Sequence, residues 1–187
     1  MRALARLALL SVALVAALSA RASDPEEQPV KRTYLTAPPA PAEQSAVQAQ
    51  AKSAGCRSCH TASDQASMHA SPGVVLGCSD CHGGDPAVAW SGGERGAAYD
   101  AARDRAHVLP RYPGAWKFPK SANPERSYAL LNKEAPEFVR FVNPGDYRIA
   151  REACGACHLA TIQAAERSLM ATSAMFWQGA AYNNGLL

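Results

Sequence analysis

The chain has few aromatic residues, 7% of the total, and no segment with the polar–apolar alternation of a half-buried β-strand. Its one long apolar run, residues 7–18, is too short to span a bilayer comfortably. No cysteine lies outside one short repeated motif. These absences argue against a β-sheet fold and a retained transmembrane helix. Proline and glycine are plentiful, with 13 of each. The sequence therefore predicts a mainly α fold with long irregular loops and little or no β-sheet.

What the chain does contain is the pattern Cys-x-x-Cys-His, three times over. The copies are CRSCH at residues 56–60, CSDCH at 78–82 and CGACH at 154–158, and they hold all six cysteines. Two thiols at this spacing can bond the two vinyl groups of one porphyrin, and the adjacent histidine can reach the iron. The pattern predicts three covalent c-type haems. The cofactor-binding cysteines would be Cys56, Cys59, Cys78, Cys81, Cys154 and Cys157, and the proximal iron ligands His60, His82 and His158.

Three other interpretations of the cysteines are weaker. Zinc sites are closed by four ligands, whereas three pentapeptides supply nine. A disulfide framework needs an even number of cysteines but gives no reason for a histidine after every pair. A thioredoxin-like dithiol requires alternating strands and helices, which this sequence does not indicate.

The first 22 residues predict a secretory signal peptide. A basic start with Arg2 and Arg6 precedes the apolar run, and Ala20-Arg21-Ala22 has the small-x-small pattern of a cleavage site. Cleavage there would leave no transmembrane anchor. We expect a periplasmic protein, with an extracellular or outer-membrane-associated location as the alternative. An oxidising compartment also suits cysteines that thioether bonds protect.

The formal charge of +3 does not indicate a nucleic-acid partner. The signal segment carries three of the 19 basic residues and no acidic one, so the mature chain would have 16 of each sign. Haem propionates would then make the holoprotein acidic. A basic surface that attracts nucleic acid is not expected.

Three regions are predicted along the chain. After the signal peptide, residues 23–41 are rich in proline and alanine and are expected to form a disordered arm. Residues 42–187 would form one domain wrapped around three haems. Within it we expect a helix over residues 42–54, another after Pro136 with Phe138, Val139 and Phe141 buried, and a third capped by Asp146.

Only two histidines, His69 and His107, lie outside the motifs. In a chain with three predicted haems we expect both to be distal iron ligands. His69 should serve one of the first two haems, because it lies between their motifs. His107 should serve the third haem or one of the early ones.

One axial position is then left without a histidine. A methionine among Met68, Met170 and Met175 could fill it, although helix packing is the simpler role for the last two. The position could instead be open, or be filled by a histidine of another chain.

Several segments resemble multihaem c-type cytochromes of metal-reducing and related bacteria. They are SMHASP at residues 67–72, LGCSDCHGGD at 76–85, SANPERSY at 121–128, FVRFVNPGD at 138–146, the third motif and AYNNG at 181–185. The resemblance covers about residues 52–187. It implies electron transfer across the periplasm or at the outer surface. Many similar proteins are longer, so the chain is either a truncated member or a compact three-haem member that pairs with another subunit.

Three functions are consistent with these features. The first is an electron-transfer protein whose partners are redox donors and acceptors, other multihaem subunits among them. The second is a haem enzyme that reduces a small oxyanion or peroxide at an open iron, which would need acid–base groups beside that iron. The third is a module that docks other subunits. We expect electron transfer, since no constellation of acid–base groups stands out.

Overall fold

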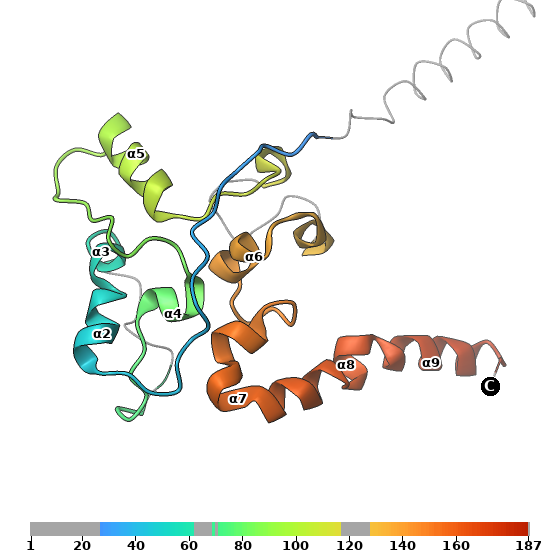
Figure 1. Ribbon diagram of the computed structural model, residues 1–187. Helices are drawn as coiled ribbons and strands as arrows, with labels where there is room; N and C mark the ends of the chain where they lie inside the picture. Colours follow the sequence, from blue (N-terminus) through green and yellow to red (C-terminus); the bar gives the residue numbers. More distant parts are fainter. Residues whose placement is uncertain (1–26, 62–68, 70, 117–127, 187) are drawn as a thin grey trace, which may run out of the picture.

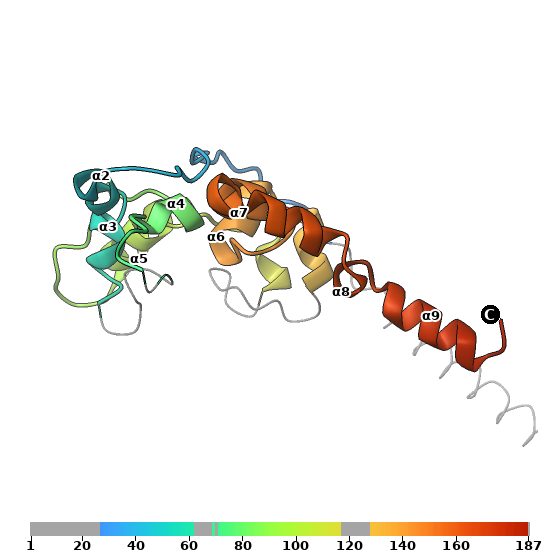
Figure 2. The same cartoon turned by 90° about the horizontal axis from the view of Figure 1, so that it is seen from below.

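The computed structural model describes residues 27–61, 69, 71–116 and 128–186, and the fold within these ranges is mainly helical (Figures 1 and 2). The helices are α2 Ala46–Ala51, α3 Ala54–Arg57, α4 Cys78–His82, α5 Ala97–Ala106, α6 Pro136–Val142, α7 Ala150–Glu166, α8 Leu169–Thr172 and α9 Ala174–Asn183, with 3₁₀ turns at Pro113–Ala115 and Tyr128–Lys133. The described residues contain no β-strand. The expected mainly α fold with long irregular connections is confirmed at this level.

The helix expected over residues 42–54 is shorter in the structure: α2 covers Ala46–Ala51, and α3 begins only at Ala54. Ser45 begins α2 through a capping box: its hydroxyl accepts from Gln48 N at 3.2 Å, and the Gln48 side chain accepts from Ser45 N at 2.8 Å. The break before α3 lies at Ser53, whose hydroxyl donates to Ala49 O and accepts from Cys78 N. A contact with the second motif, distant in sequence, therefore divides this helix.

The later helices follow expectation in part. Proline opens α6 at Pro136, where its missing N–H costs nothing, and Phe138 and Val139 are buried as predicted. Asp146 does not cap the next helix. Its carboxylate instead pairs with the Arg148 guanidinium at 2.6 Å, and Ile149 occupies the N-cap of α7. The prediction for Asp146 was wrong because residues 147–149 form a turn before α7, and the Asp146 carboxylate accepts from the Arg148 main-chain N–H within that turn at 3.0 Å.

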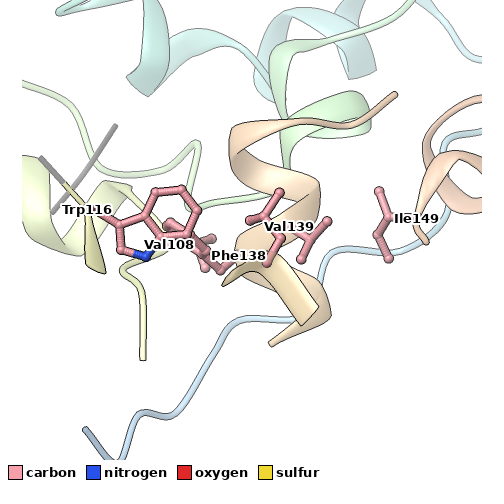
Figure 3. Close-up of a cluster of buried hydrophobic side chains, with 6 residues drawn as sticks. Val108, Trp116, Phe138, Val139 and Ile149 are labelled. Carbon is pink, nitrogen blue, oxygen red and sulfur yellow. The ribbon is translucent and has the colours of Figure 1, made fainter. Parts of the chain in front are cut away.

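A small hydrophobic core supports the carboxyl-terminal half of the body (Figure 3). Its buried members are Val108, Trp116, Leu131, Phe138, Val139 and Ile149. The rings of Trp116 and Phe138 meet edge to face, with centroids 5.0 Å apart. Buried Glu134 accepts from the Trp116 indole N–H at 3.1 Å, so the polar end of the ring is satisfied. This core fixes α6 against the loop that follows α5.

Residues 27–41 belong to the segment expected to form a disordered arm, and in the structure they have no helix or strand. They run as an extended segment across the body to α2 (Figure 1). Val30 N donates to Arg111 O at 2.8 Å, Tyr34 Oη to Leu109 O at 3.0 Å, and Ala40 N to Glu152 O at 2.9 Å. An extended proline-rich chain exposes its backbone groups, and here distant segments supply their hydrogen-bond partners. Residues 23–26 lie outside the described ranges.

The end of the described chain leaves the body. Helices α8 and α9 continue away from α7 in both views (Figures 1 and 2), joined at Ser173 in the left-handed conformation with φ 58°. Their large side chains, among them Met170, Phe176 and Trp177, are exposed. Among the described residues, no helix combines the length and apolarity that crossing a membrane requires.

Candidate functional site

The first and second motifs are held side by side by their backbones. Ser79 N donates to Lys52 O at 3.1 Å, and Gly55 N donates to Pro86 O at 2.8 Å. A Cβ on Gly55 would lie 2.3 Å from Val88 O, and one on Gly77 would lie 2.5 Å from Ala49 O. Each glycine directly precedes the first cysteine of a motif. Both are therefore required where the backbones approach too closely for any side chain.

The thiols of neighbouring motifs also lie close together. Burial raises the pKa of the Cys56 thiol to about 11, and the adjacent Cys78 sulfur contributes. Burial likewise raises the pKa of Cys81, with Cys154 as the next cause. Helix α4, which carries the second motif, packs against α6 and against α7, which carries the third. The second motif therefore lies between the other two.

A buried arginine fastens the second motif in this place. Arg140 is only 3% exposed, and its guanidinium donates to four main-chain carbonyls. These belong to Ala37, Pro38, Asp80 and Cys81, at 2.7–3.2 Å. One side chain of α6 thus joins the extended segment 27–41 to the carbonyls beside the second motif.

A second polar cluster holds the start of α4. The Asp80 carboxylate, 3% exposed, accepts from Lys52 Nζ at 2.6 Å, Gln44 Nε2 at 2.6 Å and Gly77 N at 2.8 Å. Burial alone would raise the pKa of Asp80, but these hydrogen bonds and the Lys52 charge outweigh it and the pKa is lowered. The cluster orients α4 with its motif toward the neighbouring segments.

The histidine of the first motif faces His107, which follows α5. The ring centroids of His60 and His107 are 6.2 Å apart, with planes inclined by 34°. His107 also lies 5.0 Å from the Phe141 ring of α6. The structure thus brings a predicted distal histidine to a motif histidine of a different segment.

The histidine of the third motif faces His69. Their ring centroids are 6.3 Å apart and their planes differ by only 8°. His158 itself lies at a kink in α7, with φ −113° and ψ 18°. This ring neighbour of His69 thus belongs to the third motif, whereas the sequence led us to expect one of the first two; its role as an iron ligand stays a prediction. Although His69 precedes the second motif in sequence, the packing of α4 against α7 brings the third motif within its reach.

His82, in the second motif, has a different environment. Its Nδ1 lies 2.7 Å from the main-chain oxygen of Phe141, and the two rings meet edge-on at 6.5 Å. A carbonyl oxygen can only accept, so Nδ1 carries the proton and donates. That tautomer leaves the lone pair on Nε2, which is the arrangement of a metal-ligating imidazole.

Both histidine pairs fit a single iron between them. A metal–imidazole bond of about 2.0 Å, plus about 1.1 Å from nitrogen to ring centre, puts two rings on opposite faces of one iron roughly 6.2 Å apart. The observed separations of 6.2 and 6.3 Å agree with that value. These two separations are compatible with a histidine on each face of an iron, and c-type haem at the three motifs stays a prediction.

Other uses of the cysteines find no matching geometry in the described residues. All six thiols are unbridged. Among the described residues, no group of three or more histidine, cysteine or acidic side chains is arranged to hold a metal ion.

Two of the three candidate methionines are exposed and lie on helices away from the second motif. Met170 on α8 and Met175 on α9 are 74% and 48% exposed, and their helices lead away from α4 in both views (Figures 1 and 2). Met68 lies outside the described residues.

Sequence reasoning named Phe141 only as a buried candidate and did not name Arg140. An arginine in the otherwise apolar run FVRFV, residues 138–142, is the signal that could have marked it, because an unpaired cation is not buried on the core side of a helix. The carbonyls it binds come from segments that sequence spacing cannot bring together.

Comparisons of the chain with protein-family models, with curated proteins and with solved structures give no match.

Proposed function

We propose that this protein is a three-haem c-type cytochrome that transfers electrons and is not itself an enzyme. The observation that carries the proposal is the separation of the two histidine pairs, 6.2 Å for His60 and His107 and 6.3 Å for His69 and His158. The pairs bring together residues from four separate stretches of chain.

Each motif would supply two thioether bonds and one proximal nitrogen. The haem, when bound, supplies reversible one-electron chemistry between ferric and ferrous iron. The chain's own residues do the rest. The cysteines hold the group covalently, and the Phe141 carbonyl fixes the His82 ring with Nε2 available.

The three motifs lie on adjoining segments, and this arrangement favours electron transfer between haems over electron storage at isolated haems. The second motif adjoins the first through Cys56 and Cys78 and the third through Cys81 and Cys154. Groups held on adjoining segments would be neighbours in a row. We propose redox proteins as the partners, with other multihaem subunits among them, and the periplasm as the compartment, since the leader and the thioether chemistry agree.

Two measurements test this function. The intact mass of the exported chain should exceed that of its polypeptide by three haems, and a Cys56→Ala/Cys59→Ala variant should carry one fewer. A potentiometric titration should take up and release three electrons per chain reversibly. A colourless mature protein, or one with sulfurs bridged or bound to zinc, would overturn the proposal.

A further inference from the structure

The histidines of this chain are fully accounted for by the structure. There are five in the sequence, and all five are described. His60 faces His107, and His69 faces His158. His82 is left with the Phe141 carbonyl and ring as its contacts. The axial position without a histidine therefore belongs to the second motif, in the middle of the row, and not to the third.

Two cationic side chains of the described residues beside α4 are engaged elsewhere. Lys52 Nζ, the amine of the polar cluster, donates to Asp80 Oδ1 at 2.6 Å and to Gln44 Oε1 at 2.8 Å. The Arg140 guanidinium has no acceptor or ligand capacity in any state. The exposed Met170 and Met175 lie on helices that lead away (Figure 2).

His82 is nevertheless oriented as a ligand should be. The Nδ1–H hydrogen bond to Phe141 and the edge-on Phe141 ring restrict rotation of the imidazole. A ring held in this way directs Nε2 at one point, and a metal there needs a partner on its far face or keeps it open. The Phe141 ring also packs against the His107 ring of the first site. This single residue therefore supports both neighbouring centres.

We infer that the iron position opposite His82 binds a small external ligand, a compact lone-pair donor such as a diatomic molecule. This rests on the proposed function, because it presumes haem at Cys78 and Cys81. Binding is a simple coordination to the open face, with no electron or group transferred. The second motif would then be the ligand-responsive centre, and the first and third motifs would be closed by histidine on both faces.

The test uses the reduced holoprotein with carbon monoxide as the probe. We expect one carbon monoxide bound per chain, and about one third of the ferric haem in the high-spin state. His107→Ala and His69→Ala should each raise the uptake from one to two per chain. Those variants open the first and third sites. If carbon monoxide uptake rises in both, the single site of the wild-type protein is the one at His82, and the second motif has not been altered to show it.

The outcomes separate this inference from the proposed function. Fewer than three haems by mass would overturn the proposed function. Three haems with no carbon monoxide uptake would overturn only the inference. Uptake that disappears at high protein concentration would also overturn it, in favour of a ligand from a second copy. If the wild-type protein binds no carbon monoxide and the Met68→Leu variant does, the inference is overturned, and Met68 is the ligand opposite His82. An adequately folded chain is shown in each variant by an unchanged helical circular dichroism spectrum.

Discussion

The ring of His158, at the kink of α7, lies 6.3 Å from the ring of His69 and nearly parallel to it. His69 precedes the second motif in the sequence, yet its partner belongs to the third. The pairing crosses the motif order because α4 and α7 pack together. The proposed function therefore implies that His69 and His107 serve different haems, and this can be measured.

The two distal histidines should act independently. His69→Ala and His107→Ala should each convert one additional haem from low to high spin, since a five-coordinate iron has a weaker ligand field. The double variant should convert two, because the pairs share no residue. Quantitative electron paramagnetic resonance of the ferric protein measures the fractions. A double variant no different from one of the singles would mean that both histidines serve one haem.

Arg140 should affect both the free energy of unfolding and the reduction potential of the haem proposed at the second motif. Arg140→Met leaves four carbonyls near the second motif without their donor, at a cost of roughly 2–4 kcal/mol in the free energy of unfolding. Loss of a buried positive charge should also lower the reduction potential of the second haem. Denaturant titration and spectropotentiometry measure the two effects.

The control for that variant is Arg148→Met. Arg148 pairs with Asp146 at the surface, where an ion pair contributes about 0–1 kcal/mol. Equal losses of stability in the two variants would contradict the special role of Arg140.

Asp80 should make stability depend on pH at the acidic end. Its pKa is lowered from the ordinary value of 3.8 because hydrogen bonds and Lys52 outweigh burial. The stabilisation is therefore complete above that value and is lost as the pH falls through the lower folded-state pKa. Asp80→Asn should lose roughly 1–3 kcal/mol at neutral pH, and the difference from wild type should shrink below about pH 4.

Denaturant titrations across the acidic range test this prediction. Asp100→Asn is the matched control, since Asp100 pairs with Arg103 on the exposed surface of α5. A wild-type to Asp80→Asn difference that stays constant down to strongly acidic pH would count against the lowered pKa.

Gly55 should not tolerate a side chain. In Gly55→Ala the new Cβ would lie 2.3 Å from Val88 O and 2.4 Å from Pro86 O, and neither main-chain atom can move away without disturbing the first motif. We expect a loss of about 1–3 kcal/mol. Gly179→Ala in α9 meets no atom within 4 Å and should gain about 0.5–1 kcal/mol of helix stability. Thermal melts compare the two, and a neutral Gly55→Ala would refute the close approach.

The chemistry proposed for each motif rests on the sequence alone because it is local. Two cysteines and a histidine within five residues can meet one porphyrin whatever the rest of the chain does, and residues 78–82 form a single short helix. Haem attachment itself stays a prediction. The mainly helical character was likewise predictable from the absence of strand alternation and the abundance of alanine. Pro136 opened its helix as expected for the same local reason.

The pairing of His60 with His107 and of His69 with His158 depended on tertiary structure, as did the position of the unmatched histidine in the second motif. The extended path of residues 27–41 also depended on tertiary structure, because the backbone partners of this segment are Arg111 and Glu152. Sequence by itself determined how many Cys-x-x-Cys-His motifs the chain carries, and hence how many haems we propose. Which histidines lie opposite the motif histidines was decided only by the packing of distant segments, since such partners meet through long-range contacts that no local spacing encodes.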